Sequence, residues 1–225
     1  MLENWIKPQI PEEEELDERL HAARSKLSVL QMQIKEHGLP VLVLFEGWGT
    51  AGKGSVLGKV IKNIDPRFFK VATMDEPTEE ERRKPFLYRY FVKIPANGKL
   101  EFLDSGWMDE VVKDVLHDNI GEKEYKKKIE SVKRFERQLT DNGYLVMKFF
   151  FQISRKEQKK RIEVLKENKD TRWRVSGDED WQNKHYDKCM HVFDRYLNDT
   201  NSPADPWYIV DAKNRKWAEL QVLET

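Results

Sequence analysis

The segment Glu46-Gly47-Trp48-Gly49-Thr50-Ala51-Gly52-Lys53-Gly54-Ser55 decides how this sequence is interpreted. It follows the apolar run at residues 41–45 and precedes apolar residues at helical spacing between 56 and 64. Successive glycines let the backbone curl so that several N–H groups face one anion, and the following helix adds the positive end of its dipole. The spacing Gly47-x4-Gly52-Lys53 fits the P-loop template, although Gly54 stands where Ser or Thr is usual and Ser55 comes one position later. The segment therefore predicts a phosphate-binding P-loop with Lys53 at the terminal phosphates; a plain glycine turn is the alternative.

Length and charge limit the possible classes of protein. A chain of 225 residues with 39% hydrophobic content can form one sizeable core, or a core with a small lid. The 40 basic and 40 acidic residues balance, so we expect no nucleic-acid partner on the ground of net charge. Between positions 123 and 174, however, 17 Lys and Arg stand against 8 Asp and Glu. This excess indicates either a basic surface or ordinary solvated helix faces.

Cysteine content and hydropathy predict the cellular setting. Cys189 is the single cysteine, so no internal disulfide can form, and the N-terminus lacks the pattern of a signal peptide. The longest apolar stretches, 41–45 and 144–153, fall short of the ~20 residues that a membrane helix needs. We therefore expect a cytoplasmic protein without a membrane span.

The order of apolar patterns predicts an α/β fold. Residues 12–37 have apolar positions at alternating steps of four and three and predict an amphipathic helix that ends at Gly38 and Pro40. Strand-like runs follow at 41–46, 68–74, 100–104, 144–153 and 207–210, with helical patterns between them. This alternation predicts a parallel sheet covered by helices, with the P-loop at the carboxyl edge of its strand. We expect an N-terminal helix unit at 1–38 and one main domain at 39–225, in which residues 155–181 form a mobile helical lid.

The C-terminal segment 214–225 has a helical pattern without a stop signal. Either the sequence continues in a longer protein, or the last helix simply frays.

Phosphoryl transfer needs a phosphate cradle, a metal ligand and cations around the transferred group. Asp104 ends the strand-like run at 100–104, which is the position of a carboxylate that can hold Mg²⁺, although a turn aspartate is the alternative. Lys148 lies inside an apolar strand, where a lysine costs several kcal/mol unless it is paired or reaches water. The candidate phosphate-binding cations are Arg89, Arg134, Arg137, Lys148, Arg172 and Arg174.

Two other groups of residues are not predicted to bind a ligand. On a helix, His185 shares a face with Cys189 but not with His191, and no second ligand pair follows at zinc spacing. The aromatic residues between 86 and 91 fit core packing better than base stacking.

Taken in order, several motifs resemble the polyphosphate kinase 2 family from about residue 39 to 212. They are the P-loop, Pro77-Thr78-Glu79-Glu80-Glu81, Phe86-Leu87-Tyr88-Arg89, Leu103-Asp104-Ser105-Gly106-Trp107, Arg134-Phe135-Glu136-Arg137-Gln138-Leu139, Lys148-Phe149-Phe150, Thr171-Arg172-Trp173-Arg174 and Ser202-Pro203-Ala204-Asp205-Pro206-Trp207. The resemblance implies a three-layer α/β/α P-loop kinase fold. It also implies that inorganic polyphosphate exchanges a phosphoryl group with a nucleoside mono- or diphosphate, with magnesium as cofactor. Gly47, Gly52, Gly54 and Ser55 would then bind phosphate, while Lys53 and Asp104 would act in catalysis.

The sequence departs from the family pattern at two places. Members usually carry an aspartate two residues after the first P-loop glycine, where this chain has Gly49, and that carboxylate is implicated in metal binding. They also usually read Asp-Arg-Ser-Trp-Tyr, whereas here Asp104 is followed by Ser-Gly-Trp-Met. The altered P-loop is most similar to the N-terminal half of two-domain polyphosphate:AMP phosphotransferases. Loss of a metal carboxylate could lower the rate by orders of magnitude.

Three functional hypotheses follow. The first is an active polyphosphate-dependent nucleotide kinase in which Ser55 or water replaces the missing carboxylate. The second is a domain that binds polyphosphate or nucleotide without chemistry, and the third is an ATP-dependent kinase on the same fold. As partners we also consider a second copy of the chain, or a second kinase-like domain in a longer protein.

Overall fold

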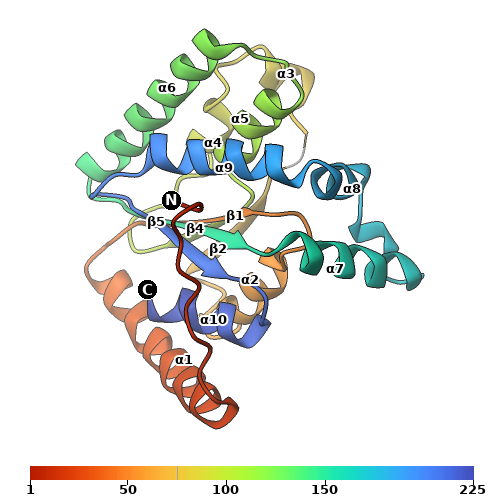
Figure 1. Ribbon diagram of the computed structural model, residues 1–225. Coiled ribbons are helices and arrows are strands. Elements are labelled where there is room, and N and C mark those ends of the chain that lie inside the picture. Colours follow the sequence, from red (N-terminus) through yellow and green to blue (C-terminus); the bar gives the residue numbers. More distant parts are fainter. Residues whose placement is uncertain (75) are drawn as a thin grey trace.

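The structure, a computed structural model, describes residues 1–74 and 76–225 and centres on a five-stranded parallel sheet (Figure 1). The strands run in the order β2-β3-β1-β4-β5. Their bounds are β1 Val41–Gly47, β2 Phe69–Thr73, β3 Leu100–Asp104, β4 Leu145–Gln152 and β5 Trp207–Asp211. All four strand pairs are parallel, with Phe45 opposite both Asp104 and Phe149. The five strands lie at the predicted positions, and the apolar runs of β1 and β3 are buried on both faces, as is usual in a parallel sheet.

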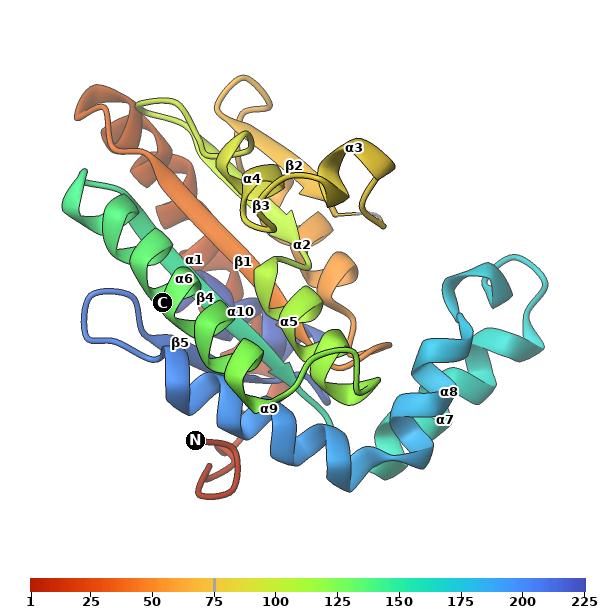
Figure 2. The same cartoon turned by 90° about the horizontal axis from the view of Figure 1, so that it is seen from above.

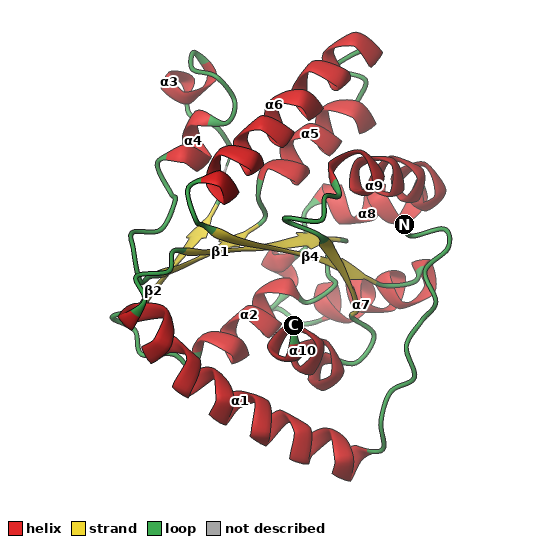
Figure 3. Cartoon of the chain, turned by 90° about the vertical axis from the view of Figure 1, so that its left-hand side faces the viewer, coloured by secondary structure: helices red, strands yellow, loops and turns green. Residues whose placement is uncertain are grey.

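Helices cover both faces of the sheet (Figure 3). One layer contains α1 Glu13–Glu36, α2 Lys53–Ile61 and α10 Arg215–Glu224. The opposite layer contains α3 Glu79–Arg82, α4 Tyr88–Phe91, α5 Trp107–Leu116, α6 Glu122–Asp141 and α9 Tyr186–Thr200. These layers confirm the predicted three-layer α/β/α fold.

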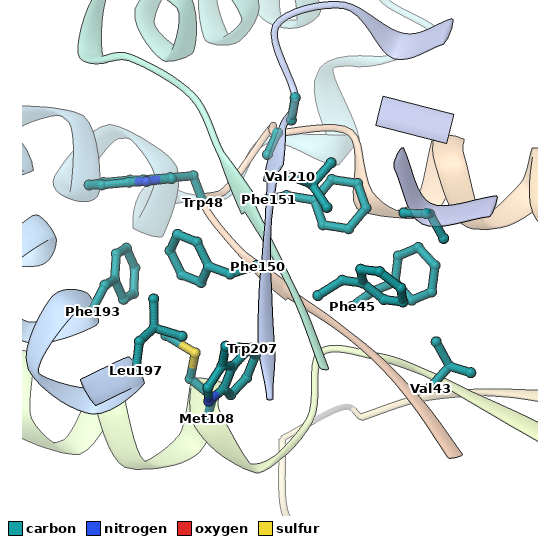
Figure 4. Close-up of a cluster of buried hydrophobic side chains, with 14 of the residues drawn as sticks. Val43, Phe45, Trp48, Met108, Phe150, Phe151, Phe193, Leu197, Trp207 and Val210 are labelled. Atoms are coloured by element: carbon teal, nitrogen blue, oxygen red, sulfur yellow. The ribbon is translucent and has the colours of Figure 1, made fainter. Parts of the chain in front are cut away.

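The core fills the space on either side of the central strands (Figure 4). Phe45 and Phe151 are stacked with ring centroids 5.3 Å apart, and Phe150, which points to the other face, meets Phe193 of α9 at 5.3 Å. Because side chains alternate across a strand, neighbouring aromatic residues of β4 supply both layers of the core. The carboxyl ends of β1 and β3, which carry the P-loop and Asp104, are thereby fixed by packing on both sides.

The predicted N-terminal helix packs on the C-terminal one. Leu16 and Leu20 of α1 form a small buried cluster with Trp217 and Leu220 of α10. Arg24 extends this contact by a 2.6 Å ion pair with the buried carboxylate of Glu219. The division of the chain at residue 38 remains a prediction.

The region expected to be a lid contains α7 Arg155–Glu167, the short 3-10 helix η1 Arg172–Arg174 and most of α8 Gly177–Lys184. Figure 2 shows α7 and α8 extending beyond the carboxyl end of β4, away from the sheet. Lys166 of α7 forms an ion pair with Asp180 of α8, which ties the two helices together. The mobility of the expected lid remains a prediction.

Within the described residues, no helix is long and apolar enough to cross a membrane. The same residues contain no group of three or more His, Cys, Asp or Glu side chains able to hold a metal ion.

Candidate functional site

The P-loop begins where β1 runs closely past β4. Gly47 has φ of 121°, and a Cβ at this position would lie 2.5 Å from the carbonyl oxygen of Phe151. Only glycine therefore fits here. Gly52, with φ of 96°, is the N-cap of α2. The first N–H groups of a helix have no intrahelical partners, so the amides that follow Gly52 are available to an anion.

Trp48 anchors the P-loop in the core, a role that sequence reasoning missed. Its side chain is fully buried and stacks on Tyr186 of α9 with ring centroids 4.1 Å apart. The indole Nε1–H donates to Gln152 Oε1 at 2.7 Å. A tryptophan inside a phosphate loop is the signal that could have predicted such an anchor.

Arg161 of α7 braces the loop from the other side and was also missed. Its Nη1 donates to the carbonyl oxygens of Thr50 and Ala51, at 3.2 and 2.7 Å. Its Nη2 donates to those of Ala212 and Lys213, at 2.8 and 2.9 Å. One guanidinium thus joins the P-loop to the β5–α10 connection, which the planar fork of arginine allows.

Lys53 lies at the mouth of the loop. Its Nζ donates to the carbonyl oxygens of Gly47 and Trp48, at 3.0 and 3.2 Å. These are neutral acceptors, so a phosphate oxygen would form a stronger, charge-assisted bond with the same ammonium group.

Asp104 is next to the first turn of α2. A Cβ at Gly54 would lie 3.2 Å from Asp104 Oδ2, so the glycine that replaces the usual Ser or Thr leaves room for this carboxylate. Burial raises the pKa of Asp104, the positive charge of Lys53 opposes that shift, and the negative charge of Asp109 adds to it.

A cavity of about 470 Å³ is lined in part by Ser105 and Gly106, the residues that directly follow Asp104. Arg89 is 7% exposed and lines this cavity together with Arg82. Acidic side chains, among them Asp109 and Glu110, form another part of the wall. The cavity has the size of a typical small-molecule site and offers both cations and hydrogen-bond acceptors.

The space beside Gly49 is taken by α8. A Cβ at Gly49 would lie 2.6 Å from Cγ of Glu179, which is too close without movement of that side chain. Gln182 Oε1 accepts hydrogen bonds from the Gly49 N–H at 3.0 Å and from Gln158 Nε2 at 3.2 Å. The α8 helix is therefore docked directly on the P-loop.

The site residues present fit a single divalent cation better than a closed metal cage. Mg²⁺ is commonly held by one or two carboxylates together with substrate phosphates. Asp104 supplies one carboxylate, and its pKa is raised in part by the nearby charge of Asp109, a repulsion that a cation would relieve.

The family model described as Polyphosphate kinase 2 (PPK2) matches residues 11–225. The chain belongs to the polyphosphate kinase 2 family. A curated polyphosphate:AMP phosphotransferase of Pseudomonas syringae is 29% identical over 215 residues, which cover 94% of this chain and 43% of that protein. The GDP-polyphosphate phosphotransferase of Mycobacterium tuberculosis is 26% identical, covering 86% of this chain and 66% of that protein. The crystal structure of polyphosphate kinase 2 from Arthrobacter aurescens aligns with a TM-score of 0.87 at 25% identity, covering 91% of this chain and 74% of that one.

The family resemblance seen in the motifs is thus confirmed. The chain spans less than half the length of the Pseudomonas protein, so it corresponds to one part of that relative.

In this polyphosphate kinase 2 domain, Lys148, which was predicted to bind phosphate, lies in the core. Its side chain is 0% exposed, and Nζ lies 2.9 Å from Glu136 Oε2 and 3.3 Å from Asp205 Oδ2. It also donates to the Thr200 carbonyl oxygen at 3.0 Å. Lys148 is buried because two carboxylates from distant segments compensate its charge.

Arg134 and Arg137 lie away from the P-loop, and their phosphate-binding role remains a prediction. Both side chains are about four-fifths exposed, and each pairs within α6, with Glu130 at 3.6 Å and Asp141 at 3.2 Å respectively. They line a surface hollow together with Ser202, which precedes β5. That hollow is at the amino edge of the sheet, opposite the P-loop.

The remaining cations are divided between two places. Arg89 is brought to the same edge of the sheet as Asp104. Arg172 and Arg174 are exposed in η1, which belongs to the arm formed by α7, η1 and α8 (residues 155–184). The guanidinium of Arg174 lies 5.2 Å from the ring centroid of Trp173. The phosphate-binding role of Arg172 and Arg174 remains a prediction.

Proposed function

We propose that this chain transfers a phosphoryl group between inorganic polyphosphate and a nucleoside mono- or diphosphate, AMP or ADP, with Mg²⁺. The observation that carries the proposal is that Lys53, the first turn of α2 and Asp104 meet at one edge of the sheet. Family membership and the names of the relatives support the same class of reaction.

The P-loop amides and Lys53 bind the terminal phosphates of polyphosphate. When a phosphate binds, Lys53 exchanges two carbonyl acceptors for phosphate oxygens and neutralises their charge. Asp104 would hold Mg²⁺, which supplies electrostatic stabilisation of the transferred group.

The acceptor nucleotide occupies the cavity beside Asp104. Arg82 and Arg89 bind its phosphates, and the acidic part of the wall accepts hydrogen bonds from the nucleoside. The bond from the terminal phosphorus to the polyphosphate chain breaks as an oxygen of the acceptor phosphate bonds to that phosphorus. Because such catalysis is mostly positioning and electrostatics, the closeness of Asp104 to α2 is the critical geometry.

The experiment measures Mg²⁺-dependent formation of ADP from AMP and polyphosphate, and of ATP from ADP. Lys53→Ala removes the ammonium group and is expected to lower kcat/KM by roughly 10² or more, as loss of one such charged contact does. Lys62→Ala is the matched control, because Lys62 is an exposed lysine just beyond the same helix. A rate that Lys53→Ala leaves unchanged would refute the proposal.

A second candidate function is binding without chemistry, and the position of Gly49 favours it. The family carboxylate is missing there, and Glu179 fills the space that it would occupy. This candidate gives polyphosphate or nucleotide affinity that falls steeply with salt and no transfer. Replacement of polyphosphate by ATP as donor tests the third possibility, an ATP-dependent kinase.

A further inference from the structure

Glu46 is a buried carboxylate at the end of β1 that neither the P-loop template nor the proposed phosphate contacts use. It is 2% exposed. Its side chain is in phase with Leu42 and Leu44, so it points to the sheet face covered by α5 and α6. An ionisable group at a position where the strand pattern calls for an apolar residue needs strong polar partners.

The partners of Glu46 are the first amides of α5. Glu46 Oε1 accepts the N–H groups of Gly106 and Met108, at 2.8 and 3.2 Å. Gly106 is the N-cap of α5 and has no side chain to fill that role. A strand carboxylate therefore performs the capping that a Ser or Asp at position 106 would otherwise provide. A Cβ at Gly106 would lie 2.9 Å from Glu46 Oε1, so the glycine makes room for the carboxylate.

The same turn is held at two further points. Ser105 has φ of 66°, and its N–H donates to the Phe45 carbonyl oxygen at 3.1 Å. The hydroxyl of Tyr90 donates to the Gly106 carbonyl oxygen at 3.1 Å. The turn that follows Asp104 is thus fastened to the strand that leads into the P-loop.

We propose that Glu46 is a positioning residue that sets Asp104 against the P-loop by fixing the turn at residues 105–108. Asp104 lies directly beside the first turn of α2, since its Oδ2 is 3.2 Å from where a Cβ at Gly54 would stand. This inference rests on the proposed function for its catalytic consequence but not for its geometry.

The charged groups around Glu46 come from both neighbouring elements. Burial raises the pKa of Glu46 to about 8, and Asp109 of α5 adds to the increase. The amides of Gly106 and Met108 and the ammonium group of Lys53 act in the opposite direction. Glu46 is therefore coupled electrostatically to the P-loop lysine as well as to the turn.

The test compares Glu46→Ala, Glu46→Gln and Glu101→Ala. The alanine removes both hydrogen bonds, whereas glutamine keeps an oxygen acceptor of the same shape. Glu101 is the matched control, because it is another buried glutamate, on β3, 5% exposed and placed three residues before the strand end that carries Asp104. We expect Glu46→Ala to lower kcat at least tenfold, with KM for both substrates within twofold. Glu46→Gln should recover most of kcat, and Glu101→Ala should leave kcat unchanged.

Amide hydrogen exchange provides a readout that does not need turnover. The Gly106 and Met108 amides should exchange at least tenfold faster in Glu46→Ala than in the unmodified protein or in Glu101→Ala. If the unmodified protein transfers no phosphoryl group, the proposed function fails while this comparison still tests the positioning. Unchanged exchange, or a loss of kcat that Glu46→Gln does not restore, overturns the inference. If Glu46→Ala does not fold, the Glu46→Gln variant decides. Wild-type kcat and wild-type exchange at both amides in that variant support the inference, and a tenfold loss of kcat overturns it.

Discussion

Replacing Lys148 by methionine tests whether this residue belongs to the core or to the phosphate site. The change removes the only cation within 4 Å of the Glu136 and Asp205 carboxylates among the described residues. Breaking a buried pair by removal of one partner costs about 3–5 kcal/mol, because the other charge is left uncompensated. For a domain of this size, that corresponds to a Tm lower by about 6–20 °C.

Arg137→Met is the matched control, since Arg137 was predicted for the same role but is exposed and paired within its own helix. Such a surface change should alter stability by less than about 0.5 kcal/mol. Thermal unfolding is measured for both variants, and transfer is measured well below Tm. We expect Lys148→Met to keep kcat/KM within about threefold, as a core substitution that leaves the P-loop intact. A variant with unchanged Tm and lost transfer would refute the argument and return Lys148 to the phosphate site.

Three further predictions address the loop and its supports. Folding raises the pKa of Glu46 from 4.5 to about 8, so between these pH values the folded state binds one more proton than the unfolded state. The free energy of unfolding therefore falls as pH rises, by up to about 1.4 kcal/mol per pH unit. Tm should be higher at pH 6 than at pH 8.5, and Glu46→Gln should make this decline less steep. Gly49→Asp should displace Glu179 and loosen α8, detected as faster proteolysis of the arm, whereas the same change combined with Glu179→Ala should leave the arm as resistant as Glu179→Ala alone. Arg161→Ala should lower Tm and transfer together, because four carbonyl hydrogen bonds are lost, while the exposed neighbour Lys160→Ala should change neither.

Gly49→Asp would restore the aspartate of the family P-loop, but the single change does not test the importance of that aspartate. Because Glu179 Cγ lies 2.6 Å from the required Cβ, failure of the single variant to raise activity would not show that the carboxylate is unimportant. The double variant with Glu179→Ala is the informative one.

Much of the fold could be predicted from local pattern. The five strands, the long N-terminal helix and the placement of the P-loop followed from runs of apolar residues and from the spacing of glycines around Lys53. Asp104 was found in the same way, because it is the polar residue that ends the strand at 100–104. These signals are local because side-chain alternation and helix period repeat within a few residues.

The roles of Lys148, Glu46 and Arg161 depended on partners that are distant in the sequence. Lys148 pairs with a carboxylate 57 positions later, and Arg161 bonds to carbonyl oxygens 110 and 111 positions earlier. A charge within an apolar strand indicates that some partner exists, but its identity is set by which segments the tertiary fold brings together. The sequence by itself therefore determined the parallel sheet and its phosphate loop, whereas only the tertiary structure decided which charges face a ligand and which neutralise one another in the core. The physical reason is that the energy of a buried charge depends on every group within a few ångströms, and most of those groups come from elsewhere in the chain.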